Sequence, residues 1–466
     1  MMRIPGSFRD PSGYVFEAEG EIFRAINDEL ATLLRELTEN GTLPRLMESG
    51  KLVKSRFVEP SDARHAALAG ANPGFRHFLH HARLERLSFP YEWSVSMLAD
   101  AALLTLDLQI ALARKGYALK DASAYNVQFV NGRPVFIDLG SIERPKRQDI
   151  WYALGQFQRH FLFPLLLTCR RGWDLCSYFT ANLDGLPLSQ VAAAFTGWSK
   201  WSVFLDVTLP YYLERKNKAG ASLNAAPRGT GSGSVEGQIL NLERLRRKIT
   251  KLVQRYRIDT VWHDYTATCT YTESSTAEKK RLIHEFLQGT QPRSVLDLGC
   301  NTGDYSYLAA GCGAEVVAAD ADSGAIELLY RRLQKEPARI QPMVVNLANP
   351  SPAIGYLNRE RPAFLERGRS ECVFALALIH HLLVSANLTL EAVRDLFATL
   401  TTRYLVLEFV PVGDPQFQRL LQFRECNTSR FTLEQCIEAF APAFRLLRQE
   451  RVAGLERTLL FFERCP

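Results

Sequence analysis

The residues best suited to chemistry lie where an apolar run gives way to a helical pattern. The stretch Ser294-Val-Leu-Asp-Leu-Gly-Cys-Asn-Thr-Gly-Asp-Tyr-Ser306 predicts a strand that ends at Asp297, a turn, and a helix that begins near Asp304. Gly299 and Gly303 permit a tight turn and let a ligand approach the backbone closely. The exposed N–H groups at the start of the helix favour polar or anionic ligand groups. This stretch therefore predicts a ligand-binding loop.

A second acidic residue follows the next predicted strand. Asp320 ends the run Glu315–Ala319 and lies 23 residues after Asp297. A carboxylate at the tip of the second strand is placed to accept hydrogen bonds from ribose hydroxyls. The pattern is Asp-x-Gly-x-Asn-x-Gly rather than the GxGxxG of dinucleotide enzymes, and Asn301 suits the middle position because asparagine also adopts left-handed backbone conformations.

This loop resembles the first motif of class I S-adenosylmethionine-dependent methyltransferases, an acid-x-Gly-x-Gly-x-Gly turn. Further segments are similar to a bacterial methyltransferase subfamily, some members of which are labelled host-specific nodulation proteins; these are Trp262–Tyr265, Tyr271, Ala348–Pro352, Ala375–Leu382 and Glu408–Pro411. The resemblance implies S-adenosylmethionine as cofactor. It implies that the residues around its methionine part are Asp297, Gly299, Asn301 and Gly303, and that Asp320 holds its ribose.

Three more residues are candidates for holding the cofactor. Asn346 ends the third predicted strand, where methyltransferases often place a side chain against the adenine amino group; it could equally be a turn residue. Tyr265 and Tyr271 precede the first strand and could cover the cofactor, since an aromatic ring attracts a sulfonium cation. They could also be core aromatics that pack the helix before the sheet.

Catalytic candidates follow the fourth and fifth predicted strands. His380 and His381 come after the fourth, and an imidazole is a suitable base for a hydroxyl or amine acceptor. Adjacent side chains diverge, so we expect only one histidine to face the acceptor; either could instead cap a helix or bind a buried carbonyl. Glu408, at the end of the fifth strand, could position the acceptor. We predict no metal site in this domain.

A second possible site lies in the first half of the chain. Asp121, Asn126 and Asp138 follow a helical pattern, and a hairpin separates the last two. This arrangement resembles the catalytic and metal-binding loops of kinase-like phosphotransferases, in which such residues orient the acceptor hydroxyl and hold magnesium. The resemblance implies a Mg-ATP site. No GxGxxG loop occurs upstream, and the hairpin-like segment Gly13–Ile26 carries Arg24 where a phosphate-binding lysine is expected, so a pseudokinase scaffold, or simple turn and cap residues, are alternatives.

Alternating apolar runs and helical patterns position the first site. The predicted strands are Ser294–Leu298, Glu315–Ala319, Ile340–Val345, Cys372–Leu376 and Tyr404–Phe409, with closing strands within Phe444–Phe462. This alternation predicts a parallel sheet covered by helices on both faces. We therefore expect an α/β protein with a C-terminal Rossmann-like methyltransferase sheet, preceded by an α+β kinase-like domain. The predicted ranges are 1–217 for the N-terminal domain, 218–236 for a Gly/Ser-rich linker and 237–466 for the methyltransferase domain.

After the predicted linker, apolar residues recur every three or four positions from Ile239 to Tyr256, which predicts an amphipathic helix. Its other face is basic, with Arg244, Arg246, Arg247, Lys248, Lys251 and Arg255. Two interpretations stay open. The face could be solvated, or it could be a patch for an anionic substrate or RNA, although no aromatic residues interleave it.

Composition sets limits on the class of protein. The chain has 466 residues, of which 47% are hydrophobic and 23% charged, with a net charge of +6, so we expect a globular protein of at least two domains without a strong nucleic-acid signal. The apolar run Phe161–Cys169 is too short to span a bilayer. The absence of an apolar signal core and of CxxC pairs among nine cysteines predicts reduced thiols and a cytoplasmic location.

Together these patterns predict a methyltransferase that acts on an O or N acceptor, a small molecule or a saccharide-derived metabolite. Two alternatives remain. The first is a phosphotransferase or bifunctional enzyme that uses the N-terminal site. The second is a non-enzymatic specificity factor that senses S-adenosylmethionine. The sequence leaves the oligomeric state open.

Overall fold

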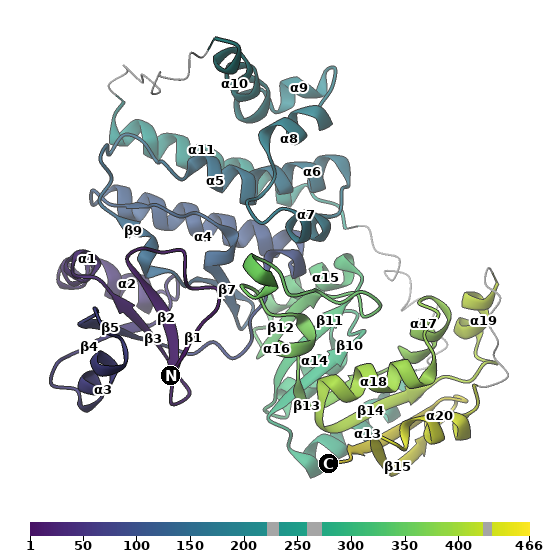
Figure 1. The fold of residues 1–466 in the computed structure, drawn as a ribbon. Helices are drawn as coiled ribbons and strands as arrows, with labels where there is room; N and C mark the ends of the chain where they lie inside the picture. Colours follow the sequence, from purple (N-terminus) through teal and green to yellow (C-terminus); the bar gives the residue numbers. More distant parts are fainter. Residues whose placement is uncertain (221–232, 259–272, 423–430) are drawn as a thin grey trace.

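The protein combines an antiparallel sheet, a layer of helices and a mostly parallel sheet, in that order along the chain (Figure 1). The computed structural model describes residues 1–220, 233–258, 273–422 and 431–466. The core of the predicted linker lies outside these residues, while helices extend to Gly220 on one side and begin at Val235 on the other.

The first sheet is antiparallel, with strand order β1-β2-β3-β5-β4. Its elements, with the helices that join them, are β1 (Met2–Arg3), β2 (Gly13–Ala18), β3 (Glu21–Ile26), α1 (Asp28–Glu39), α2 (Thr42–Glu48), β4 (Ser55–Val58), α3 (Ala63–Ala71) and β5 (His77–His81). The predicted hairpin over Gly13–Ile26 is confirmed as β2 paired with β3. Phe16, Phe23 and Phe78 are buried together on one face of this sheet.

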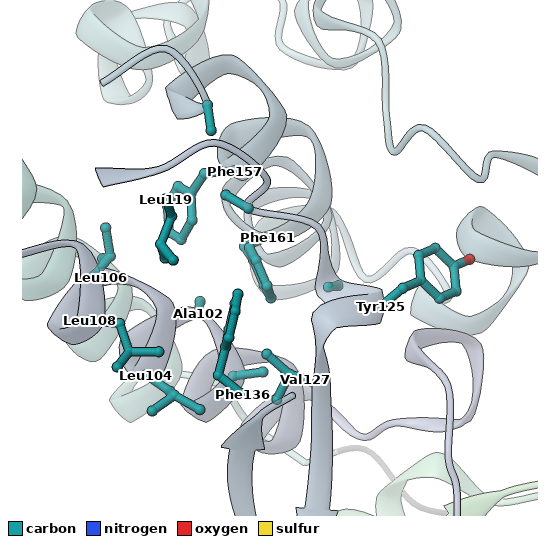
Figure 2. Packing of buried hydrophobic residues seen from close by; sticks show 14 of the residues in the cluster. Ala102, Leu104, Leu106, Leu108, Leu119, Tyr125, Val127, Phe136, Phe157 and Phe161 are labelled. Carbon is teal, nitrogen blue, oxygen red and sulfur yellow. The ribbon is translucent and has the colours of Figure 1, made fainter. Parts of the chain in front are cut away.

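A helical layer follows, built around α4 (Val95–Ala113). This helix is long and apolar enough to cross a membrane by length and composition, but most of it is buried inside the protein. Figure 2 shows its leucines beside Phe136, Phe157 and Phe161, all of them buried. The other elements here are β6 (Ala118–Leu119), β7 (Val127–Val130), β8 (Arg133–Phe136), β9 (Ile142–Glu143), α5 (Leu154–Phe157), α6 (Phe163–Arg171), α7 (Leu175–Ala181), α8 (Leu188–Ala194), α9 (Ser199–Ser202), α10 (Leu209–Gly220) and α11 (Val235–Gln254).

Helix α11 begins at Val235, beside the predicted domain boundary at residue 237, and packs against the N-terminal half. Its buried stripe of Leu242, Leu245, Ile249 and Leu252 joins the core formed by α4, α6 and the rest of the N-terminal half. The sequence predicted the amphipathic helix correctly but assigned it to the C-terminal domain. An apolar stripe shows that a helix must pack, and only the tertiary structure shows against which core.

The second sheet has seven strands in the order β12-β11-β10-β13-β14-β16-β15. The first five pair in parallel, and β16 and β15 are antiparallel, so the predicted parallel sheet and its closing strands are confirmed. The strands are β10 (Ser294–Leu298), β11 (Glu315–Asp320), β12 (Ile340–Val344), β13 (Ser370–Ala375), β14 (Thr401–Phe409), β15 (Phe444–Arg451) and β16 (Thr458–Arg464). Its helices are α13 (Glu273–Thr290), α14 (Asp304–Gly311), α15 (Ser323–Lys335), α16 (Phe364–Arg367), α17 (Ile379–Val384), α18 (Leu390–Leu400), α19 (Pro415–Leu421) and α20 (Leu433–Phe440).

Buried polar contacts join the two halves where α15 meets α4. Glu327 of α15 is buried and accepts hydrogen bonds from the backbone N–H of Ser96, at 2.8 Å, and from the Ser96 hydroxyl. A carboxylate placed at the start of α4 satisfies a free N–H group and interacts favourably with the helix dipole. The Tyr330 hydroxyl donates to Asp100 of α4 at 2.7 Å. Specific hydrogen bonds therefore contribute to the contact between α15 and α4.

Candidate cofactor and acceptor site

The strand order reverses between β10 and β13, and the edge of the sheet at the carboxyl ends of these two strands is called the crevice below. The chain runs outward from β10 through β11 to β12 and then returns to β13 on the other side of β10. In open α/β sheets ligands bind at such a reversal, outside the carboxyl ends of the strands. Leu298 pairs with Ala375, so the turns that follow these two strands lie side by side.

The glycine-bearing turn after β10 has the backbone geometry that the sequence predicted. Gly299, Asn301 and Gly303 all have positive φ, of 69°, 50° and 83°. A Cβ atom on Gly303 would lie 2.5 Å from the Leu329 side chain, and one on Gly299 would lie 3.2 Å from Leu378. Backbone conformation therefore favours glycine at both positions, and the space around Gly303 is the tighter of the two.

Asp320 lies beside this turn, at the end of β11. Its two carboxylate oxygens accept hydrogen bonds from the backbone N–H groups of Asn301, at 2.8 Å, and Asp322, at 2.9 Å. Burial raises the pKa of Asp320, and these two N–H groups oppose the rise only in part. A carboxylate with raised pKa would be stabilised by further hydrogen-bond donors.

Asp297 lies beneath the turn rather than at its surface. Its side chain is buried and accepts a hydrogen bond of 2.6 Å from the Ser306 hydroxyl on α14. Burial raises the pKa of Asp297 to about 6. Asp297 thus ties the end of β10 to the helix that follows, and its place near the cofactor stays a prediction.

The structure brings the predicted catalytic residues together at the ends of β13 and β14. The rings of His380 and His381 lie 4.3 Å apart, and Arg457, which pairs with Glu408, lowers the pKa of both histidines. His380 is buried against Phe417, and within the described part of the chain neither of its ring nitrogens has a hydrogen-bond partner. His381 is only half-buried, and burial lowers its pKa to about 4. Both imidazoles are therefore neutral at pH 7.

Glu408 belongs to a buried network of charges that the sequence did not reveal. Its carboxylate accepts a 2.6 Å hydrogen bond from Lys279 and lies 3.7 Å from Arg457, which also pairs with Asp414. All four side chains are buried, and their charges balance. Such a network holds the end of β14 in place. Glu408 would therefore act on an acceptor through the residues that it contacts. The acceptor-positioning role of Glu408 stays a prediction.

One feature of the site, the backbone conformation of Ala377, was not visible in the sequence. Three predicted cofactor residues, Asn346, Tyr265 and Tyr271, remain to be placed. Ala377, between β13 and α17, has φ of 49°, a strained conformation for a residue with a side chain. No sequence signal marks it, because alanine does not favour this conformation. Asn346 is exposed, and its side chain accepts a hydrogen bond from the Ala348 N–H at 3.0 Å, as a turn residue does. Tyr265 and Tyr271 lie outside the described residues.

The N-terminal candidates also gather in one place, around a cation from β3. Arg24 pairs with Asp138, whose carboxylate also accepts from the Gly140 N–H at 3.1 Å. Burial alone would raise the pKa of Asp138, but Arg24 and these hydrogen bonds lower it. Asp121 accepts from the Ser123 N–H at 2.9 Å and hydrogen-bonds with Asn126. Burial and the charge of Asp138 raise the pKa of Asp121.

A group of three or more His, Cys, Asp or Glu side chains that could hold a metal ion is absent from residues 1–220, 233–258, 273–422 and 431–466. A magnesium ion at the N-terminal cluster would thus depend on Asn126 and on displacement of Arg24. The kinase-like character of this half stays a prediction.

The fold and the crevice define a Rossmann-like α/β protein with a glycine turn and an acid at neighbouring strand ends. The nodulation protein NoeA of Rhizobium meliloti strain 1021 is 33% identical to this chain over 474 residues, which cover 99% of this chain and 96% of that protein. The chain therefore belongs to the family of NoeA. No family model matches it.

Several solved structures share part of the fold at low identity. Magnesium protoporphyrin IX methyltransferase from Synechocystis PCC 6803 is 17% identical, covers 41% of this chain and 80% of its own, and has a TM-score of 0.30. The N-methyltransferase NodS of Bradyrhizobium japonicum is 13% identical over 41% of this chain and 88% of its own, with a TM-score of 0.31. The bifunctional kinase-methyltransferase WbdD is 15% identical over 43% of this chain and 42% of its own, with a TM-score of 0.31. The fold assignment above rests on this chain's own sheet order.

Proposed function

We propose that this protein is a methyltransferase that uses S-adenosylmethionine to methylate an oxygen or nitrogen of a small-molecule or saccharide-derived acceptor. One observation carries the proposal. A turn with three left-handed residues lies next to Asp320, a half-buried carboxylate that accepts hydrogen bonds from the backbone N–H groups of Asn301 and Asp322.

The residues present fit the proposed cofactor. S-adenosylmethionine supplies a methyl group already activated on a sulfonium. Gly299 and Gly303 leave backbone that a ligand can approach, Asp320 would accept hydrogen bonds from the ribose, and Asn346 is exposed near the same edge of the sheet. The remaining work of the protein is to orient the acceptor and exclude water.

His381 is the residue we propose as base. It is half-exposed and neutral at pH 7, so it can reach an acceptor and take the proton that a hydroxyl or amine loses as its lone pair bonds to the methyl carbon. His380 is buried beneath it and would hold the ring of His381 in place. His381→Gln should then lower kcat strongly and leave cofactor affinity unchanged. Equal turnover in this variant would exclude the role.

Calorimetry with S-adenosylmethionine and the full chain tests the site itself. Asp320→Ala removes an ionised acceptor of two ribose hydrogen bonds, and we expect about a hundredfold weaker binding. The matched control is Asp395→Ala, because Asp395 is an exposed acid on α18, away from the strand ends. Asp320→Asn keeps one acceptor and should give an intermediate loss, which separates cofactor contact from collapse of the turn. No heat with the wild-type protein would overturn the proposal.

A phosphotransfer activity is the second candidate, because Asp121, Asn126 and Asp138 do cluster. The ion pair of Arg24 with Asp138 opposes it, since that carboxylate already has a counter-charge. Magnesium-dependent ATP binding that disappears in Asp138→Ala would establish this activity. Binding of S-adenosylmethionine without turnover of any acceptor in a cell extract would favour the non-enzymatic alternative instead.

A further inference from the structure

Most of the basic face of α11 borders a cavity that is open to solvent. This cavity, of about 720 Å³, lies between α11, the end of α6 and the short helix α9. Seven cationic side chains surround this cavity, and they are Arg170, Arg171, Arg244, Arg247, Lys248, Lys251 and Arg255. The only carboxylate bound to any of them within the described ranges is the buried Asp206, which pairs with Arg244 and Lys248. The cavity therefore carries a large excess of positive charge.

Ordinary structural roles account for only part of this charge. Arg170 and Arg171 lie in the last turn of α6, where cations interact favourably with the helix dipole. Arg247 has no such role, since it lies in the middle of α11, whereas Lys251 lies in the last turn of that helix. Neither side chain has an ion-pair partner in the described chain. Placing them opposite the arginines of α6 costs repulsion between like charges. An anionic ligand would relieve that repulsion.

Exposed apolar side chains border the same cavity. Trp198 is 90% exposed and Trp201 is 68% exposed, and both flank the residues of α9 that line the cavity. Ser199, on that helix, accepts a 2.7 Å hydrogen bond from Arg171, so the rim that carries the tryptophans is tied to the basic wall. Leu205 and Tyr212 continue the exposed series at 60% and 63%.

Exposure divides the side chains of this segment into two sets. Trp198, Trp201, Leu205 and Tyr212 are exposed, and they lie on or beside three successive pieces, which are α9, the π-helical turn Phe204–Thr208 and α10. Val203, Asp206 and Val207, between them, are buried. The segment is thus amphipathic, and its apolar face is turned away from the protein next to a concentration of positive charge.

We propose that this face docks on an anionic lipid bilayer, with the basic cavity receiving phosphate groups of the lipid heads and Trp198 and Trp201 entering the interfacial layer. Tryptophan prefers this layer because its ring is apolar and its N–H polar. Clustered Lys and Arg side chains bind anionic leaflets, and apolar residues beside them add to the binding. The chemistry needs no membrane-spanning segment.

Two other occupants explain less of the surface. A soluble phosphorylated molecule would use the cavity but would leave the tryptophans and Leu205 in water. Single-stranded RNA would use the charge and stack on the rings, but it gains nothing from an exposed leucine, because leucine has no face for a base to stack on. The joint presence of cations, tryptophan and leucine favours lipid.

Vesicle sedimentation with the full chain tests the proposal. We expect binding to vesicles rich in phosphatidylglycerol, no binding to phosphatidylcholine alone, and loss of binding in high salt. The double variant Arg247→Ala/Lys251→Ala should lower the partition coefficient about 25-fold, at about fivefold for each basic residue near the surface. The control is Arg246→Ala. Arg246 also lies on α11 but pairs with Asp107 outside the cavity, and its loss should change little.

The tryptophans give a second and independent measurement. Vesicles should shift the fluorescence of the wild-type protein to shorter wavelength, and this shift should largely vanish in Trp198→Phe/Trp201→Phe. Tyr356→Ser, which alters another side chain that is 61% exposed, should leave vesicle binding unchanged. Thermal unfolding of each variant checks that the fold is retained.

Four outcomes would overturn the proposal. These are failure to bind phosphatidylglycerol vesicles, equal loss of binding in Arg246→Ala, tighter binding of pyrophosphate or oligouridylate than of vesicles, and a dimer in solution that Trp198→Ser dissociates. The third result would assign the cavity to a soluble phosphate or RNA, and the fourth would assign the apolar face to a second copy of the chain.

Discussion

The crevice of the C-terminal sheet and the Asp138 cluster of the N-terminal half use similar residues to opposite effect. In both, a carboxylate at or just after the end of a strand accepts a hydrogen bond from a backbone N–H group of the following turn. Arg24 pairs with Asp138, and the pKa of Asp138 is lowered. Asp320 forms no ion pair with a cation of the described residues, and burial raises its pKa. A cation of the chain itself neutralises Asp138, whereas Asp320 would gain from a ligand that donates hydrogen bonds.

The largest test of this comparison removes the internal cation. Arg24→Met leaves Asp138 without its cationic partner and takes from Asp10 one of two cations, the other being Lys120. We expect the free energy of unfolding to fall by about 3–5 kcal/mol in urea denaturation at pH 7. Adding Asp138→Asn should restore most of the loss, because the unpaired charge is then gone. If Arg24→Met unfolds as easily as the wild type does, Arg24 is not what satisfies this site.

The second-largest expected effect is the loss of stability that acid causes at the crevice. Burial lowers the pKa of His381 to about 4, so between pH 6.5 and 4 the unfolded chain binds a proton that the folded protein excludes. The free energy of unfolding should therefore fall as the pH drops through this window, by about 2 kcal/mol more in the wild type than in His381→Gln. Urea denaturation of both proteins at pH 7 and pH 4 measures the difference.

The Asp138 pair changes stability in the same direction as His381 does, but in a lower pH window. Because its folded pKa lies below the ordinary value of 3.8, its contribution is present above that value and is lost only as the pH falls further. Wild type and Arg24→Met/Asp138→Asn should therefore lose stability in parallel between pH 6.5 and 4. A divergence there would show that the two sites do not differ in the way proposed.

The smallest expected effect concerns backbone strain beside the crevice. Ala377 and Asn301 both have positive φ, but asparagine tolerates this conformation better than alanine. Ala377→Gly should raise the free energy of unfolding by about 1 kcal/mol, and Asn301→Gly should raise it less. Thermal unfolding can rank the two variants. A larger gain for Asn301→Gly would contradict the assignment of strain to Ala377.

Much of the C-terminal half could be predicted from the chain. Its strands are near-continuous apolar runs with turn residues between them, and each predicted run falls on an observed strand. Gly299 and Gly303 predicted the turn, because few other residues adopt its left-handed backbone conformation. The partners of Glu408 could not be predicted. Lys279 precedes it by 129 residues and Arg457 follows it by 49, and a charged residue carries no mark of being buried.

Helix α11 shows the same limit of prediction from the sequence. Its apolar stripe was visible in the sequence, but its placement against α4 was not. The basic face was also visible, while the second basic wall came from Arg170 and Arg171, more than 70 residues away.

The sequence by itself determined the elements, the glycine turn and the acids that end neighbouring strands, because periodicity and backbone preference are local properties. The tertiary structure decided which charges are neutralised, by bringing Arg24 to Asp138 and Lys279 to Glu408. It also decided which cations, those of α6 and α11, line a common cavity. Those outcomes depend on contacts between distant segments, where burial and pairing set the energy of each charge.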